Sequence, residues 1–370
     1  MIPWILLLGT AALLGLGAIF YFYLITRVRR FSFLGRLAEK HRALSWLIAI
    51  AAVASLFLLW SVNLYAVVIA VLYTALIWLL CDLSAWIVRR IRKTEPKRYW
   101  AGAAAVALSA ILLISGWIAA HRVRRTHYEV QTDRIEAPLR IALIADSHLG
   151  VTLDGAAFAK ELRRIEAEQP DLLVIAGDFV DDDSEKADLV RACEALGTFS
   201  APYGVYYVYG NHDDGYGRYR DFTPLELREA LESNGVVILE DEAAQLRSDV
   251  TLIGRRDRSS KDRRSAEALL KSVGAETYNI LLDHQPNDYA AEAAAGANLV
   301  LSGHTHGGHV FPAGQIGILL GANDAIYGRT VRGDTTFIIT SGISGWAIPF
   351  KIGAVSEYVI IDLIPKGAKP

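Results

Sequence analysis

The feature that most constrains this sequence is a set of four long apolar stretches in its first third. They cover residues 3–25, 44–62, 66–88 and 99–120. Each is long enough for a bilayer-spanning helix, which needs about 20 residues. Seven of the eight tryptophans lie before residue 121, several near the ends of these stretches, as is typical of the membrane interface. We therefore expect residues 1–122 to form a transmembrane region with four helices, as in an integral, multi-pass cell-membrane protein.

The charges between the stretches predict how this region is oriented. The loops after the first and third stretches each carry six Lys or Arg residues, whereas the short link at Asn63 carries none. Loops rich in Lys and Arg stay in the cytoplasm. With an even number of spans, the N-terminus and everything after His121 would lie on the extracytoplasmic side. Arg122, Arg124 and Arg125 argue against this orientation but are outnumbered.

The two parts of the chain have opposite charge. Residues 1–126 hold 15 Lys and Arg and 3 acidic residues, whereas the rest of the chain holds 23 and 37. An acidic second part makes nucleic acid an unlikely partner, because binding to a phosphate backbone draws on clustered Lys and Arg. The two cysteines, Cys81 and Cys193, lie far apart and indicate no disulfide framework.

Residues 127–370 show the pattern of an α/β domain, in which short apolar runs alternate with helical stretches. Polar clusters follow these runs directly. Functional loops gather where the strands of a sheet end, so residues distant in sequence can converge there. The clusters are Asp146-Ser147-His148, Gly177-Asp178, Gly210-Asn211-His212-Asp213, Asp283-His284 and Gly303-His304-Thr305-His306.

Taken singly, these clusters have structural explanations: Gly177-Asp178 can be a turn, and His284 a packed histidine. Five of them in series after strands indicate a metal site instead. Carboxylates, imidazoles and an amide suit Mn, Fe or Zn better than the all-oxygen shells of Ca or Mg do. Two such ions about 3.5 to 4 Å apart can hold a bridging hydroxide and clamp a phosphate. We therefore expect two divalent metal ions as cofactors.

The motifs DSH, GD, GNHD, H and GHTH, in this order and spacing, resemble those of the calcineurin-like metallophosphoesterase superfamily. The resemblance covers roughly Arg140 to Asp362, and GHTHGG is its most specific part. The multi-span N-terminus resembles that of membrane-anchored members. This resemblance implies a four-layer αββα sandwich with metals at the strand ends, here preceded by a four-helix transmembrane region. His309 stands where the membrane-associated relatives carry glutamine.

The resemblance also implies a role for each motif residue. The first ion would be bound by Asp146, His148 and His306, the second by Asn211, His284 and His304, and both by Asp178. His212 would act on the phosphate oxygens or the leaving group, with Asp213 orienting it. The implied reaction is cleavage of a phosphomonoester, phosphodiester or pyrophosphate bond through attack by a metal-bridging hydroxide.

Two further features bear on the phosphate-containing substrate. Arginines follow two of the strands, at Arg218 and Arg220 and at Arg255, Arg256 and Arg258, and would either hold a second phosphate or sugar or form a solvated face. The segment 342–353 offers Ile343, Trp346, Ile348 and Phe350 as an apolar lip, or else closes the core. A lip facing the lipid bilayer would favour a lipid-linked or envelope substrate, because tethering raises its effective concentration.

Two other classes of function stay open. One is a catalytically silent receptor or regulatory module that binds metal on a membrane anchor; the complete ligand set with His212 and Asp213 argues against it. The other is a transporter, for which Asp82 inside the third stretch is the main argument. The sequence leaves the substrate, the metals used in the cell and the oligomeric state open.

Overall fold

The computed structural model describes residues 15, 17–93, 98–215 and 220–367. By its contacts the chain divides into two compact units, Met1–Ser115 and Gly116–Pro370. The first unit is helical, and the second contains all the strands of the described chain.

The first unit contains several apolar helices. Three helical runs are long and apolar enough to cross a membrane, Arg42–Ser61, Leu64–Arg92 and Trp100–His121. The first run joins α3 (Arg42–Ala54) to the 3₁₀-helix η1 (Ser55–Ser61), the second is α4 (Leu64–Arg92) and the third is α5 (Trp100–His121). These three runs correspond to the second, third and fourth predicted spans.

The first predicted span, residues 3–25, is described only at residue 15 and from residue 17 onward. Residues 17–25 belong to a shorter apolar helix, Gly17–Val28, which precedes α2 (Ser32–Lys40). The described chain therefore has three membrane-length helices, and most of the first predicted span lies outside the described residues. Within the first and third of these, only 17% and 22% of the most apolar window is buried. A helix that is apolar on all sides and mostly uncovered suits a lipid environment.

Asp82, the acid inside α4, lies among hydrogen-bond donors. The hydroxyl of Tyr99 donates to its carboxylate at 2.7 Å and that of Tyr23 at 3.3 Å. Arg27 forms an ion pair with it, with Nε at 3.0 Å from Oδ2. Since an acid within an apolar helix needs such partners, these contacts give Asp82 a structural role in joining helices. This arrangement favours an anchor over a transport path.

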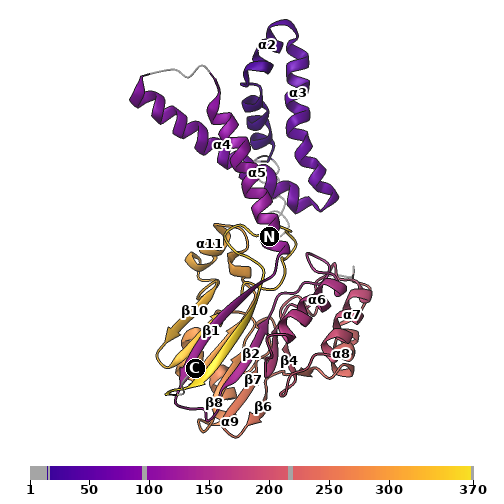
Figure 1. Cartoon of the computed structure of the whole chain (residues 1–370), viewed down its shortest axis with the longest axis vertical. Coiled ribbons are helices and arrows are strands. Elements are labelled where there is room, and N and C mark those ends of the chain that lie inside the picture. Colours follow the sequence, from indigo (N-terminus) through magenta and orange to yellow (C-terminus); the bar gives the residue numbers. More distant parts are fainter. Residues whose placement is uncertain (1–14, 16, 94–97, 216–219, 368–370) are drawn as a thin grey trace. The chain divides into compact units, whose positions relative to one another are not determined.

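The second unit is built on two six-stranded sheets. In spatial order, the first consists of β1 (Arg124–Thr132), β12 (Glu357–Pro365), β2 (Leu139–Ile144), β3 (Leu172–Ala176), β4 (Val205–Val208) and β5 (Val237–Ile238). The second consists of β10 (Gly328–Arg332), β11 (Thr335–Ile339), β9 (Leu299–Ser302), β8 (Tyr278–Leu282), β7 (Val250–Gly254) and β6 (Glu242–Arg247). Figure 1 shows the last strand, β12, running beside β1.

Most neighbouring strands are parallel. In the first sheet β2, β3, β4 and β5 run in one direction. In the second sheet β7, β8, β9 and β11 do the same. The sequence Leu-Leu-Val-Ile-Ala of β3 is buried throughout, as expected of a strand covered on both faces. Because the strands are parallel, their carboxyl ends gather at one edge of each sheet, where the metal-type motifs begin.

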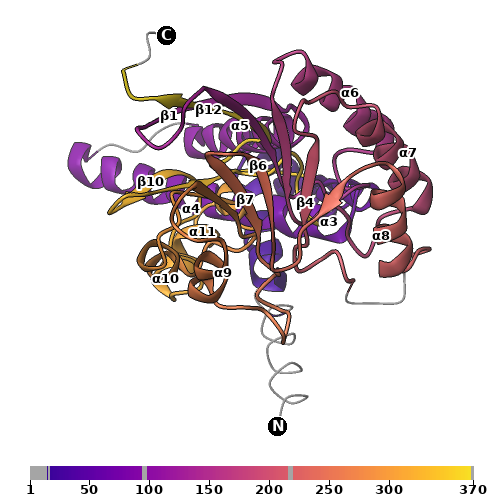
Figure 2. The same ribbon diagram turned by 90° about the horizontal axis from the view of Figure 1, so that it is seen from below.

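Helices cover the outer face of each sheet, giving the four layers expected of an αββα sandwich. Figure 2 shows one group on one side of the strands, α6 (Gly155–Glu166), α7 (Lys186–Gly197) and α8 (Pro224–Ser233), with α9 (Ala266–Val273) and α10 (Tyr289–Ala294) on the other. Phe158 and Leu189 pack with Ile175 outside the first sheet. Val174 and Leu252 meet between the sheets. Outside the second sheet, Leu269 and Tyr289 pack with Phe337.

The end of α5 is part of the second unit and is fixed to its loops. The backbone N–H of Lys351 donates to the carbonyl of Gly116 at 3.0 Å, and that of Ser356 donates to Ala119 at 2.8 Å. The rings of Trp117 and Phe350 meet edge to face, with centroids 5.6 Å apart. The final turns of α5 therefore lead directly into the sandwich through β1.

Candidate metal centre

The loops at the carboxyl ends of the strands bring the predicted side chains together. Among the residues that the structure describes, three groups of Asp and His side chains have ligand atoms that all lie within 4.8 Å of one another. They are Asp146, His148 and His306; Asp178, His284 and His304; and His148, Asp181 and His212. Residues from five separate strand ends thus converge, as the order of the motifs predicts.

The first group gathers two imidazoles and a carboxylate. The Nε2 atoms of His148 and His306 lie 3.2 Å apart, and His306 Nε2 lies 3.9 Å from Asp146 Oδ1. Burial lowers the pKa of His306 well below its ordinary value, which leaves its imidazole neutral. Burial also raises the pKa of Asp146 to about 6. Two imidazoles converging beside a buried carboxylate form a set that a divalent cation would complete.

The second group includes an oxygen that lies near the first group. Asp178 Oδ2 is 3.1 Å from His284 Nε2 and 3.7 Å from His148 Nε2. Burial would raise the pKa of Asp178, but the nearby imidazoles, His284 foremost, hold it below its ordinary value. Asp178 therefore lies between the two groups, where a bridging carboxylate would be needed.

A backbone carbonyl group orients the ring of His284. Its Nδ1 contacts the carbonyl oxygen of Ala176 at 2.7 Å, which aims Nε2 at the cluster. That Nε2 is buried and faces the carboxylate of Asp178, with Oδ2 at 3.1 Å. A backbone carbonyl behind one imidazole nitrogen with the other left for a cation is the usual support of a metal-binding histidine. The residues of this group thus fit a metal ion.

Asn211 lines the same cavity as Asp178 and His304. Its side-chain oxygen lies 3.4 Å from Nε2 of Gln285. Burial lowers the pKa of His304 to about 4, which keeps this imidazole neutral as well. The structure therefore brings all seven predicted metal ligands to one region of the sandwich.

The backbone is strained at this site. Positive φ angles in residues other than glycine occur at Asp146, His148, Asp178, His304 and His306. Each such conformation costs roughly 1–3 kcal/mol, and such residues are typical of functional sites. Glycine is required beside them: a Cβ on Gly177 would lie 2.6 Å from His284 Nδ1.

His212 and Asp213 have different neighbours in the structure. The carboxylate in contact with the His212 ring is that of Asp181, whose Oδ1 is 3.0 Å from Nδ1. Asp213 is buried and accepts hydrogen bonds from the backbone N–H groups of Asp178, Phe179, Val180 and Gly210. The Asp213 carboxylate therefore fixes the two loops that carry Asp178 and Asn211, because it accepts hydrogen bonds from the backbone of both.

Sequence reasoning missed Asp181. It lies three residues after Asp178, at the end of the same strand, and also approaches His148 Nδ1 at 3.3 Å. Burial would lower the pKa of His212, but the hydrogen bond with Asp181 and the charge of Asp178 raise it. The spacing of an acid three residues after the Gly-Asp motif was the available signal for this residue.

One cavity opens beside the second ligand group and has a largely apolar wall. It has a volume of about 500 Å³ and is lined by His304 and His306 together with apolar residues. Those apolar residues are Val310, Ala313, Ile326, Trp346 and Ile348. The predicted lip is thus divided, since Trp346 and Ile348 line the cavity whereas Ile343 and Phe350 are buried in the core. His309 Nε2 contacts the carbonyl of Ile348 at 3.1 Å and so supports this wall.

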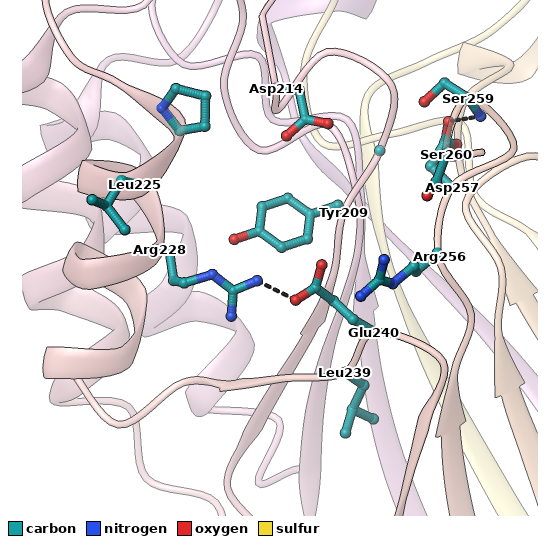
Figure 3. A pocket seen from close by; sticks show the side chains of 12 residues that line it. Tyr209, Asp214, Leu225, Arg228, Leu239, Glu240, Arg256, Asp257, Ser259 and Ser260 are labelled. Carbon is teal, nitrogen blue, oxygen red and sulfur yellow. Dashed lines mark hydrogen bonds and ion pairs between the residues drawn. The ribbon is translucent and has the colours of Figure 1, made fainter. Parts of the chain in front are cut away.

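A second pocket, of about 370 Å³, adjoins Gly210 and has a polar wall. Figure 3 shows Arg256, Asp257, Ser259 and Ser260 on one side of it and Arg228 on the other, with Arg228 reaching across to form an ion pair with Glu240. Arg255 belongs elsewhere: its guanidinium is buried against Asp283 at 3.0 Å and Asp288 at 2.8 Å.

Two further predicted arginines that the structure describes, Arg220 and Arg258, do not line this pocket. Arg258 is exposed and outside its lining. Arg220 donates from Nη2 to the carbonyl of Asp213 at 2.9 Å. Arg218 lies outside the described residues.

A two-sheet sandwich that gathers Asp and His side chains at the ends of its strands is a metal-binding α/β domain. Residues 139–308 match the family model described as calcineurin-like phosphoesterase. The second unit of this chain belongs to the calcineurin-like metallophosphoesterase family.

Relatives from bacteria and animals carry the same family name. An uncharacterized metallophosphoesterase of Helicobacter pylori is 29% identical over 243 residues, which cover 64% of this chain and 63% of that protein. A transmembrane protein with metallophosphoesterase domain from Bos taurus is 30% identical over 283 residues, covering 72% and 62%. The match thus spans less than two thirds of these relatives' length.

Among solved structures, a dimetal phosphatase from Danio rerio aligns with 56% of this chain and 88% of its own, at 13% identity and a TM-score of 0.38. A likeness of that size says nothing about activity.

Proposed function

We propose that this chain is a membrane-anchored phosphohydrolase with two metal ions, which cleaves phosphomonoester, phosphodiester or pyrophosphate bonds. Residues 1–122 would form the anchor and residues 127–370 the catalytic domain. The observation that carries the proposal is the position of Asp178, within 3.1 Å of His284 and 3.7 Å of His148. A carboxylate between two imidazole-rich groups is what a pair of ions needs as a bridge.

The geometry supports one assignment of ligands. Asp146, His148 and His306 would hold one ion, Asn211, His284 and His304 the other, and Asp178 both. The mixture of imidazole, carboxylate and amide favours Mn, Fe or Zn. When bound, such ions supply an activated water and positive charge for the phosphate.

His212 would hold the proton for the leaving group. It lines the cavity, and Asp181 fixes its ring through Nδ1. Proton transfer by a positioned imidazole contributes typically ~10² to 10⁴-fold to a rate. We assign the orienting role to Asp181, and to Asp213 the role of holding the Asp178 loop through its backbone amides.

The apolar wall of the cavity supports a lipid-linked phosphate or pyrophosphate as substrate. Trp346 and Ile348 line the cavity together with the ligand His304, so an apolar chain attached to the phosphate would have apolar surface to contact. The twelve basic residues of the two loops favour an extracytoplasmic catalytic domain.

The test is hydrolysis by the purified full chain in nanodiscs, loaded with Mn. The substrates are p-nitrophenyl phosphate, bis-p-nitrophenyl phosphate and a lipid-linked pyrophosphate, and the comparison is Asp178→Asn. Glu194→Gln, an exposed acid on α7, is the matched control. Metal-dependent turnover that Asp178→Asn abolishes supports the hydrolase. Bound metal with no turnover of any substrate would favour the receptor or regulatory module.

A further inference from the structure

An uncharged and exposed apolar segment follows the last metal motif. From Gly303 to Asn323 the chain has no Asp, Glu, Lys or Arg. This stretch contains the 3₁₀-helix η2 (His306–Gly308) and α11 (Ala313–Leu319). Leu319 is 84% exposed and Leu320 is 77% exposed, and Ile316 and Ile318 are exposed as well. A contiguous apolar surface of this kind marks a place where another apolar body binds.

The other side of α11 belongs to the metal site. Ala313, Gly314 and Gly317 line the cavity that contains His304 and His306. A Cβ on Gly314 would lie 2.5 Å from the Cα of Gly308, so glycine allows the helix to approach the motif closely. The helix therefore separates the cavity from whatever contacts its exposed side.

Hydrogen bonds connect this segment to the end of α5 within the second unit. The N–H of Phe311 donates to the carbonyl of Ile352 at 2.8 Å, and the N–H of Ile352 donates to His309 at 2.8 Å. The next residue, Lys351, donates from its backbone N–H to Gly116 of α5 at 3.0 Å. The segment preceding α11 is thus bonded to the strip that holds the last turns of a membrane-length helix.

We infer that the exposed side of α11, together with Leu320 just after it, rests in the headgroup boundary of the lipid bilayer. The metal cavity on the other side of α11 would then open at the membrane surface. The inference rests on the proposal that α5 spans the membrane. If the chain leaves the bilayer at the end of α5, the segment that is hydrogen-bonded to this end must lie close to the lipid.

The bilayer is the partner favoured by the chemistry of the segment. It lacks charges of either sign, whereas most protein interfaces have a polar rim with charged residues. Interfacial helices bury apolar side chains about 5–10 Å into the headgroup and acyl boundary, with aromatic residues beside them. Trp346, exposed at the same cavity, supplies such an aromatic residue. The substrate would be a phosphate-bearing amphiphile that stays in the bilayer while its phosphate reaches the cavity.

The experiment measures how deeply a spin label on α11 lies in the bilayer, and it does not require enzymatic turnover. The full chain carries Cys81→Ala and Cys193→Ala to remove both cysteines, and is spin-labelled at Leu319→Cys in nanodiscs of phosphatidylcholine. The matched control is Leu225→Cys, a leucine of α8 that is 63% exposed. Electron paramagnetic resonance compares accessibility to oxygen, which concentrates in lipid, with accessibility to a water-soluble nickel complex.

We expect the label at position 319 to be accessible to oxygen and shielded from nickel, and the label at 225 to show the reverse. Equal nickel accessibility at both positions would overturn the inference. Shielding at 319 from both reagents would indicate a protein partner instead, and would overturn it as well. Unchanged bound metal in each variant shows that the fold is intact.

A second variant tests the consequence for substrate. Leu319→Ser with Leu320→Ser should reduce turnover of a bilayer-embedded pyrophosphate at least about tenfold, since two apolar side chains that the lipid would bury are lost. Turnover of soluble p-nitrophenyl phosphate should stay unchanged. An equal fall on both substrates would contradict membrane docking. A lipid-buried label in a chain that hydrolyses nothing would leave the docking standing and remove the proposed hydrolase.

Discussion

The two pockets beside the metal-ligand cluster meet at one short segment and differ in chemistry. Asn211 lines the first, whose wall is largely apolar, and the adjacent Gly210 lines the second, which is polar. The apolar wall comes largely from one continuous stretch after the last motif. The polar wall is assembled from the loop after β4, α8, the segment between β5 and β6, and the loop after β7.

This difference suggests that the metal centre and the pocket walls have separate roles, the centre in bond cleavage and the walls in the choice of substrate. Several of the proposed ligands line the first pocket, whereas the second adjoins them only through Gly210. The ligands would determine which bond type can be cleaved, because the bound ions would hold the phosphate. The walls would determine which substrates bring a phosphate there. Substitutions at the centre should therefore affect all substrates alike, whereas substitutions in one wall should affect only the substrates that contact it.

The largest effect is expected at the centre. Asp178→Asn should remove at least one metal ion and reduce turnover of every substrate to background, because the bridging charge is lost. Metal content measured by mass spectrometry, alongside rates, checks this. Treatment with a chelator should have the same effect on the parent chain, and Mn should restore it. Loss of turnover on lipid substrates alone would break the distinction between centre and walls.

The next effect is at His212. We expect His212→Ala to reduce kcat ~10² to 10⁴-fold with both metals retained, since it removes a proton donor and no ligand. Asp181→Asn should have a smaller effect of the same kind, about 10 to 100-fold, as for a residue that orients another. Rates beside metal content separate these variants from Asp178→Asn. Unchanged kcat in both would exclude the proposed roles.

A smaller effect is expected in the polar wall. Arg256→Ala should raise KM about 10 to 100-fold for substrates that carry a second phosphate, because a charge-assisted hydrogen bond contributes roughly 1.5–3 kcal/mol. Its kcat should not change. Arg258→Ala is the matched control, since Arg258 is exposed and lies outside the pocket lining. Equal effects of the two variants would show that the pocket does not select substrates.

The smallest effect is expected in the apolar wall. Ile348→Ala should raise KM for a lipid-linked substrate by roughly tenfold, as the loss of a few methylene contacts costs ~1–3 kcal/mol. Steady-state rates on p-nitrophenyl phosphate should remain the same. If Arg256→Ala impaired the lipid-linked substrate more than Ile348→Ala did, the assignment of the apolar wall to the lipid chain would be wrong.

Much of this molecule is readable from local sequence pattern. The apolar stretches at 44–62, 66–88 and 99–120 correspond to helices, because the length and composition of a stretch alone set its suitability for a bilayer. The strands that precede Asp146, Asp178 and His304 were equally predictable, since buried parallel strands are short runs of apolar residues. The motif residues follow these strands directly.

Other features depend on where side chains point, and local pattern does not determine that. Arg255 and Arg256 are neighbours in sequence, yet one is buried in ion pairs and the other lines a pocket, because successive residues leave the backbone in different directions. The division of the lip at residues 343–350 has the same cause.

The sequence by itself determined the membrane-length helices, the α/β class and the order along the chain of the motif residues that we propose as metal ligands. Only the tertiary structure decided that Asp181 contacts the ring of His212, that Asp213 holds the backbone of the Asp178 loop, and that α11 covers the cavity. The first set follows from periodicity and composition within a few residues. The second arises from contacts between distant segments, which are fixed only when the two sheets pack and bring their strand ends together.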